Sequence, residues 1–179
     1  MRFPFTPLAA SCLMLAGPLC AQEGAPSSSM PPAAPACTAP VAPTGALAPW
    51  SNPASLTAGA DGAHAALLKA GQAAQIALLP TPAVTYPLQP EKPGGSVSHG
   101  GVMALEVAQA GTYRIALSSG AWLDVVGADG AQRSVAHGHG PECSGIRKMV
   151  DFALKPGHYT VQVSANGQDT IRVLVAALP

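Results

Sequence analysis

The chain has 179 residues, and its nine lysines and arginines are balanced by nine aspartates and glutamates, so the formal net charge is zero at neutral pH. This balance leaves no basic stripe for nucleic acid or for an anionic membrane surface, and it leaves no acidic tail. We therefore expect no nucleic-acid partner, while the five histidines make the charge sensitive to pH near neutrality.

Residues 1–21 are typical of a secretory signal peptide. Arg2 supplies a positive charge, residues 3–19 are uncharged and mostly apolar, and the segment ends on the small residue that a signal peptidase requires. Prolines interrupt this run, which is shorter than the ~20 apolar residues of a membrane-spanning helix. Lipid attachment at Cys12 or Cys20 is an alternative, but neither has the full pattern of preceding small and aliphatic residues. We expect a periplasmic or secreted protein with no transmembrane span after cleavage.

Residues 22–58 are rich in proline and alanine and show neither helical nor strand periodicity. We expect this segment to be extended, disordered and poorly packed. Cys37 lies within it, and Cys143 is the other cysteine that remains after cleavage. Two cysteines in an oxidising compartment most simply form one disulfide, which would strap this segment onto the globular part of the chain. The alternative is a pair of reactive or metal-bound thiols.

Residues 59–179 carry the pattern of a folded domain. The stretch 60–71 predicts a weak helix, with Asp61 as its N-cap. Two short extended segments follow at 74–80 and 81–88, the second of them edge-like because prolines cannot donate to a strand ladder. A loop rich in proline and glycine comes next.

The last 80 residues read as a run of strands separated by short, glycine-containing turns that are typical of antiparallel hairpins. The predicted strands are 102–109, 112–119, 121–127, 131–137, 147–155, 158–165 and 170–177. Two of the turns share a pattern in which a glycine is followed by Tyr113 or Tyr159 two residues later, and we interpret them as equivalent hairpins. The sequence predicts one all-β domain, an antiparallel β-sandwich or jelly roll.

The stretch "HGHGPE" is the strongest candidate for a chemical site. His137 and His139 are two residues apart, so on a strand they point to the same face and could bind one ion. Glu142 could add a carboxylate, which completes a set suited to iron, manganese or zinc. The alternative is a glycine-rich turn in which all three side chains are solvated. No cofactor is then expected, and iron or zinc is expected only if the metal interpretation holds.

Aromatic and cationic residues suggest a binding surface. Trp122, Tyr113 and Tyr159 could line a sugar-binding face, although three aromatic residues on strands are also typical of a core or its rim. The adjacent cations Arg147 and Lys148 suit contact with an acidic group, or simply a solvated surface. No serine lies in a nucleophile-elbow sequence, so the chain offers no motif for acyl transfer.

Three resemblances accompany these patterns. The order Gly130, His137, His139 is similar to the first metal-binding motif of cupins, with two residues instead of three or four before Glu142. Residues 60–179, and "HGHGPECSGIRKMVDF" in particular, resemble small exported bacterial proteins named homogentisate 1,2-dioxygenase. This resemblance implies an iron-dependent dioxygenase with the two histidines and the glutamate as ligands. The rhythm "AGTYRIAL…WLDVV…LKPGHYTVQV" resembles bacterial pre-peptidase C-terminal domains, which implies an accessory or binding β-sandwich.

Two functional hypotheses from different classes follow, with a purely structural envelope protein as a third. The first is an exported, non-enzymatic β-sandwich module that binds an envelope glycan or a protein partner. The second is a small metalloprotein or dioxygenase-like enzyme that uses His137, His139 and Glu142.

Overall fold

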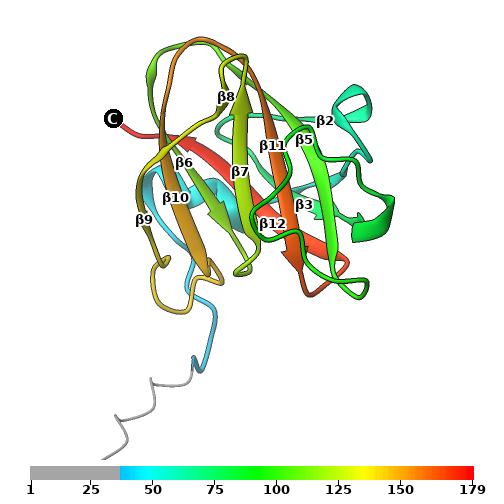
Figure 1. The fold of residues 1–179 in the computed structure, drawn as a ribbon. Coiled ribbons are helices and arrows are strands. Elements are labelled where there is room, and N and C mark those ends of the chain that lie inside the picture. Colours follow the sequence, from blue (N-terminus) through cyan, green and yellow to red (C-terminus); the bar gives the residue numbers. More distant parts are fainter. Residues whose placement is uncertain (1–36) are drawn as a thin grey trace, which may run out of the picture. The chain divides into compact units, whose positions relative to one another are not determined.

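The structure, a computed structural model, describes residues 37–179. The predicted signal peptide and residues 22–36 of the proline- and alanine-rich segment lie outside the described residues. The described residues form two β-sheets packed face to face, which confirms the predicted all-β sandwich (Figure 1). Apolar side chains from the inner faces of both sheets fill the space between them.

Sheet A has six strands, and its free edges are β1 and β9. Across the sheet the order is β1 (Ala54–Thr57), β3 (Ala73–Ala77), β12 (Thr170–Ala177), β6 (Gly111–Leu117), β10 (Lys148–Leu154) and β9 (Ser134–Gly138). All neighbours are antiparallel except β1 and β3, which are parallel. In β12, Ile171, Val173 and Val175 face the core, while the alternate residues Leu174 and Ala176 are buried on the outer face of the sheet.

Sheet B runs in the order β2 (Ala66–Leu68), β5 (His99–Val107), β11 (Gly157–Asn166), β7 (Trp122–Gly127) and β8 (Gly130–Ala131), and β4 (Leu79–Pro80) pairs with the start of β5. The pair β2–β5 is parallel and the others are antiparallel. β8 is only two residues long, so it covers only Val126 and Gly127 at the end of β7.

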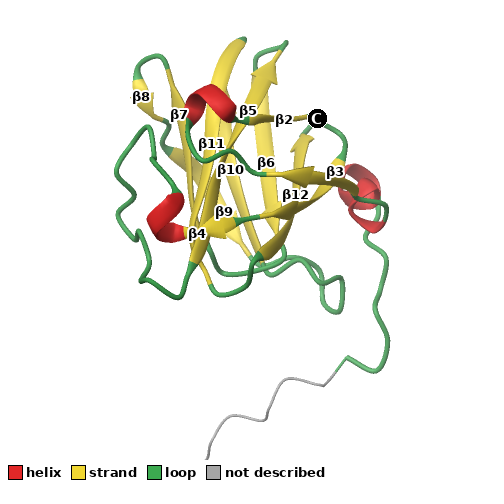
Figure 2. Cartoon of the chain, turned by 90° about the vertical axis from the view of Figure 1, so that its right-hand side faces the viewer, coloured by secondary structure: helices red, strands yellow, loops and turns green. Residues whose placement is uncertain are grey.

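The outer face of sheet A is covered by η1 (Gly45–Ser51), a 3-10 helix (Figure 2). Leu47 and Trp50 of this helix are buried in a second apolar cluster with Ala116 and Leu174 of the sheet. The sandwich therefore begins before residue 59. Residues 22–58 are predicted to be extended and poorly packed, but η1 and β1, within 45–57, belong to the folded domain. The sequence of this segment shows no helical or strand periodicity, so the burial of Leu47 and Trp50 against sheet A could not be predicted from it.

The predicted disulfide between Cys37 and Cys143 is present, with 5.4 Å between the two Cα atoms. Next to it, the Val41 N–H donates to Cys143 O (2.8 Å), and the Trp50 Nε1–H donates to Ser144 O (3.0 Å). The segment that precedes η1 is therefore strapped to the β9–β10 connection, as the cysteine count predicts.

The helix predicted over 60–71 is wrong. Asp61 is a cap, since its carboxylate accepts from the backbone N–H of Ala63 and His64, but the helix is the single 3-10 turn η2 (Gly62–His64). β2 then follows and pairs with β5, which buries Leu68 in the core. Strand pairing and the burial of Leu68 outweigh the high helix propensity of the alanines in this stretch.

The edge strand predicted over 81–88 is also wrong. The chain forms the short helix η3 (Thr81–Ala83) and then a loop that lies over the outer face of sheet B (Figure 2). Polar side chains of β11 hold this loop in place. Gln162 donates from Nε2 to Leu88 O (2.7 Å), and its Oε1 accepts from Leu88 N–H (3.3 Å). Ser164 donates to Lys92 O (2.7 Å), so hydrogen bonds to the backbone replace a strand ladder.

The two turns with the glycine-x-tyrosine pattern are corners between sheets and not hairpins. β5 and β11 belong to sheet B, whereas the strands joined to them at these turns, β6 and β10, belong to sheet A. The Tyr113 hydroxyl donates to Gln109 O (2.9 Å), and the Tyr159 hydroxyl donates to Lys155 O (2.9 Å). Each tyrosine thus bonds back to the fourth residue before it, as in the tyrosine corner of immunoglobulin-like sandwiches. The repeated pattern is explained by two equivalent crossings.

Candidate functional site

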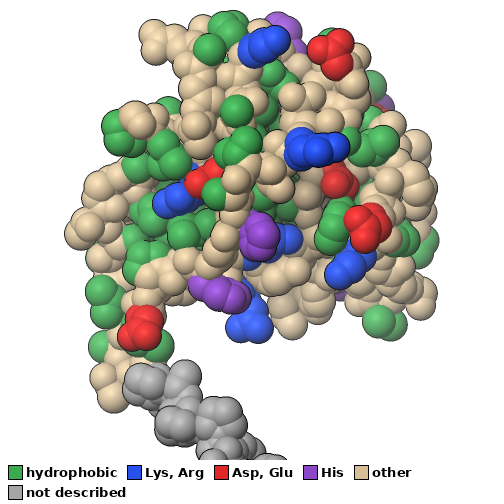
Figure 3. Space-filling view, turned by 60° about the vertical axis from the view of Figure 1, so that its left-hand side comes forward, with side chains coloured by type: hydrophobic (Ala, Val, Ile, Leu, Met, Phe, Trp, Pro, Cys, Tyr) green, Lys and Arg blue, Asp and Glu red, His purple; other side chains and the backbone are tan. Residues whose placement is uncertain are grey.

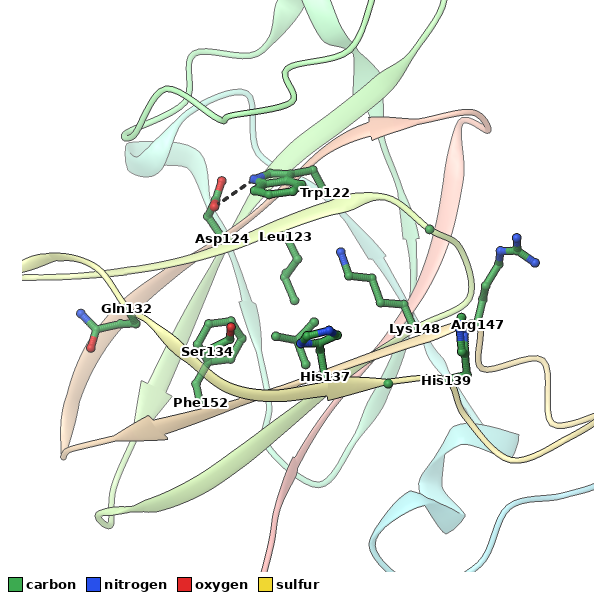
Figure 4. A pocket seen from close by; sticks show the side chains of 13 residues that line it. Trp122, Leu123, Asp124, Gln132, Ser134, His137, His139, Arg147, Lys148 and Phe152 are labelled. Carbon is green, nitrogen blue, oxygen red and sulfur yellow. Dashed lines mark hydrogen bonds between the residues drawn. The ribbon is translucent and has the colours of Figure 1, made fainter.

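A groove opens at one side of the sandwich, between β9 at the edge of sheet A and the part of β7 in sheet B that the short edge strand β8 leaves uncovered (Figure 4). We call it the lateral groove. Its cavity volume is about 670 Å³, which is within the usual range for ligand sites. The groove is lined by Gly120, Trp122, Leu123, Asp124, Gln132, Ser134, His137, Gly138, His139, Arg147, Lys148, Val150 and Phe152.

The strand register sets which side chains face the groove. His137 is paired with Val150 and Ser134 is paired with Phe152, and paired residues lie on the same face of a sheet. Because Val150 and Phe152 belong to the core, His137 and Ser134 also point to the inner face of sheet A. Figure 4 shows His137 directed from β9 toward Leu123 of β7. These side chains are exposed because sheet B has no full strand opposite them.

The predicted metal ligands are only partly brought together. His137 of β9 and His139, just after the end of this strand, both line the lateral groove, whereas Glu142 is exposed in the β9–β10 connection and does not line it. Nδ1 of His139 lies 3.0 Å from Arg147 O, and since a carbonyl only accepts, this nitrogen carries the hydrogen. Within residues 37–179, no three His, Cys, Asp or Glu side chains gather as metal ligands. The three residues expected to hold iron or zinc are therefore not assembled into one site.

The predicted sugar-binding aromatic residues do not share a face. Tyr113 is buried in the core, on β6 of sheet A. Tyr159 is on β11, near Gly127 at the end of β7 that is remote from Trp122, and its hydroxyl is bonded to the backbone of Lys155. Of the three, only Trp122 lines the lateral groove.

Trp122 is the centre of a polar cluster at one end of the groove. Its Nε1–H donates to Asp124 Oδ1 (3.0 Å), and Gln162 Nε2 donates to Asp124 Oδ2 (3.0 Å). The ammonium groups of Lys92 and Lys148 lie 5.3 and 5.6 Å from the centroid of the indole ring, within cation–π distance. The sequence does not indicate Lys92 or Gln162. Strand pairing places Gln162 of β11 beside Asp124, and the loop over sheet B brings Lys92 near Trp122.

Lys148 spans the groove. It is the first residue of β10 in sheet A, and its Nζ donates to Ala121 O (2.9 Å), immediately before β7 of sheet B. Burial lowers the pKa of the Lys148 ammonium, the nearby Lys92 charge lowers it further, and the Asp124 carboxylate opposes both effects. An incoming carboxylate would favour the charged form of this lysine and would be attracted by it.

The electrostatic character of the groove is cationic. Histidine side chains lie beside lysine and arginine side chains on the β9 side of the molecule (Figure 3). Lys148, Arg147 and the two histidines line the groove, whereas Asp124 is the one acidic residue among the lining residues and is engaged by Trp122 and Gln162. The floor is apolar, formed by Leu123, Val150 and Phe152. This arrangement suits a ligand with an anionic group and an apolar body.

A scan against models of known protein families gives no match to this chain, and a search of curated proteins gives no match either. No helix among residues 37–179 combines the length and the apolar character needed to cross a membrane.

Proposed function

We propose that this protein is an exported, non-enzymatic binding module that captures a protein partner in the lateral groove. The observation that carries the proposal is the groove itself. It opens between two sheet edges, has an apolar floor, and collects the cations Lys148 and Arg147 with two imidazoles around one entrance. These features favour recognition over catalysis. Among the residues that line the groove, no nucleophile is hydrogen-bonded to a base that a third group orients.

A protein partner is favoured over an envelope glycan by the positions of the aromatic residues. A sugar-binding face needs exposed rings on which pyranoses can stack, and Tyr113 and Tyr159 contribute none to the groove. The Trp122 ring is already approached by two ammonium groups. The disulfide and the predicted signal peptide support export, because disulfides persist in oxidising compartments.

The metalloprotein alternative has less support. An oxygenase of the kind implied by the family resemblance needs two histidines and a carboxylate around one iron. Glu142 does not join His137 and His139 on the groove wall. Asp124 also lines the groove, but its two oxygens accept from Trp122 and Gln162, and among residues 37–179 it does not gather with the two histidines as a ligand set. We therefore do not propose an enzymatic role.

The proposal is tested by selecting a phage-displayed random peptide library on the mature protein and, in parallel, measuring binding of polygalacturonate and dextran. We expect enriched peptides to bind the wild type and to lose affinity with His137→Ala. His158→Ala is the matched control, because His158 is an exposed histidine on β11 that does not line the groove. Binding of a polysaccharide but no peptide, or equal peptide binding by His137→Ala, would overturn the proposal.

A further inference from the structure

The lateral groove occupies the place of a missing strand. In the described part of the chain, β8 pairs only with Val126 and Gly127 of β7. The chain then leaves sheet B after Gln132, whose N–H donates to Val125 O (2.7 Å). Sheet A, in contrast, continues through β10 to β9. Among the described residues, β11 pairs with one edge of the segment Trp122–Val125, but no strand of sheet B pairs with its other edge, although the opposite sheet extends past it.

The free edge of β7 offers main-chain hydrogen-bonding groups. In an antiparallel ladder, the N–H and C=O of alternate residues point to opposite edges of the strand. Because Val125 O points toward Gln132, the N–H and C=O of Leu123 point to the same outer edge. No strand among residues 37–179 pairs with Leu123 on that edge. The segment Trp122–Val125 spans roughly 13 Å at about 3.3 Å per residue.

The surroundings suit an extended chain. A strand placed beside Leu123 would direct alternate side chains inward, onto the apolar floor of Val150 and Phe152. The other side chains would point outward. The inward side chains would face His137 and Ser134 on the inner face of sheet A. Such a strand would thus be held by main-chain bonds on one side and apolar contacts below.

The direction of β8 predicts the direction of the added strand, and the lysine charges lie at one end of it. A strand that continues the row of β8 is antiparallel to β7, as β8 is, so its C-terminal end lies beside Trp122. This is the end where Lys148 and Lys92 approach the indole. Lys148 also occupies Ala121 O, which marks the limit of the free edge. The cations therefore lie where the incoming strand ends.

We infer that the partner binds as an extended segment that adds to the free edge of β7 as a further strand of sheet B, with a carboxylate beside Lys148 and Lys92. This inference rests on the proposed function and specifies the form of the partner. The carboxylate belongs either to the C-terminus of the partner or to an acidic side chain at that end of the segment. Its chemistry is the same in both cases.

The test uses N-acetylated hexapeptides TVTVTV and isothermal titration calorimetry with the mature protein. One peptide has a free C-terminal carboxylate, one is C-terminally amidated, and one is amidated with a glutamate as the last residue. We expect the free acid or the glutamate peptide to bind about tenfold more tightly than the neutral amide. Lys148→Met should remove this difference, whereas Lys155→Met, at an exposed lysine after β10, should keep it.

Strand addition is tested separately with N-methylated versions of the tightest peptide. Methyl groups on one set of alternate residues, whose N–H groups face β7, should abolish binding, while methyl groups on the other set should be tolerated. Equal effects of both sets, or equal affinity of the acid and the neutral amide, would overturn the inference and leave the proposed function standing. Absence of binding by all hexapeptides, with binding of polygalacturonate that depends on His137, would overturn both.

Discussion

Lys148 and Ala121 join the two sheets at the mouth of the lateral groove, because the ammonium of the first donates to the carbonyl of the second at 2.9 Å. The lysine is thereby held close to the Trp122 ring and to the free edge of β7. Burial lowers the pKa of the Lys148 ammonium, because the charged form loses part of its hydration. In the proposed function, a bound carboxylate compensates for this loss.

We therefore expect Lys148→Met to separate binding from folding. Loss of one hydrogen bond, worth about 1 kcal/mol, is offset by relief of the desolvated charge, so the free energy of unfolding should change by less than about 1 kcal/mol. Binding of the carboxylate peptide should fall to that of the neutral amide. Urea unfolding and calorimetry measure the two effects, and a large loss of stability would show that Lys148 is mainly structural.

The Arg114–Asp151 pair should be important for stability. Both guanidinium–carboxylate hydrogen bonds are 2.8 Å long, Asp151 is buried, and the bidentate contact raises the pKa of Arg114. Arg114→Met leaves the carboxylate buried without its partner and should lower the free energy of unfolding by roughly 3 kcal/mol. The double variant with Asp151→Leu should recover most of this loss. If it is as unstable as the single variant, the charge is not the cause.

The disulfide should contribute strongly to stability. Cys37 and Cys143 are separated by 106 residues, and closing a loop of that size stabilises by about 4–5 kcal/mol on the chain-entropy model. Cys37→Ala with Cys143→Ala should lower the free energy of unfolding by up to this amount. The fluorescence of Trp50 reports the transition, since its indole is bonded to Ser144 beside the strap. An unchanged transition midpoint would contradict this prediction.

Tyr86 should make the fold sensitive to alkaline pH. Its hydroxyl donates to Val163 O (3.1 Å), and burial raises the pKa of Tyr86 from 10.0 to about 12. Because the folded-state pKa is the higher one, its contribution to stability is complete below the unfolded-state pKa and is lost as pH rises through the folded-state value. The free energy of unfolding should fall between these two pH values in the wild type and fall less in Tyr86→Phe. Parallel curves for the two proteins would exclude this role.

The two tyrosine corners should be structural and should not affect binding. Tyr113→Phe and Tyr159→Phe each remove one hydrogen bond, so each should lower the free energy of unfolding by about 1 kcal/mol. Neither should alter the affinity of the carboxylate peptide. A loss of affinity with Tyr159→Phe would instead restore this residue to the binding surface.

The late strands could be predicted from the sequence because their signals are local. Alternation and short glycine turns predict the observed bounds of β12. They also predict the bounds of β6, β7, β10 and β11 to within one or two residues. The i, i+2 spacing of His137 and His139 predicts a shared face if both lie on a strand, and both line the lateral groove. β9 ends at Gly138, so the strand fixes the position of His137, whereas His139 follows it and bonds to Arg147 O.

Other features depend on contacts between distant residues and could not be read locally. Whether a glycine turn joins neighbours in one sheet or crosses to the other depends on which strands pair, so the corners at Tyr113 and Tyr159 read as hairpins. Trp50 is buried because sheet A offers an apolar outer face, although its own segment shows no periodicity. Lys92 reaches Trp122 because Gln162 and Ser164 hold the loop over sheet B.

The most direct test of strand addition is amide hydrogen exchange of the mature protein, with and without saturating carboxylate peptide. If the peptide adds to β7, exchange of the Leu123 N–H should slow markedly on binding, because that group becomes part of a ladder. Amides of β1, at the edge of sheet A remote from β9, serve as the internal control and should be unchanged. Bound peptide with unchanged exchange at Leu123 would contradict strand addition at this edge.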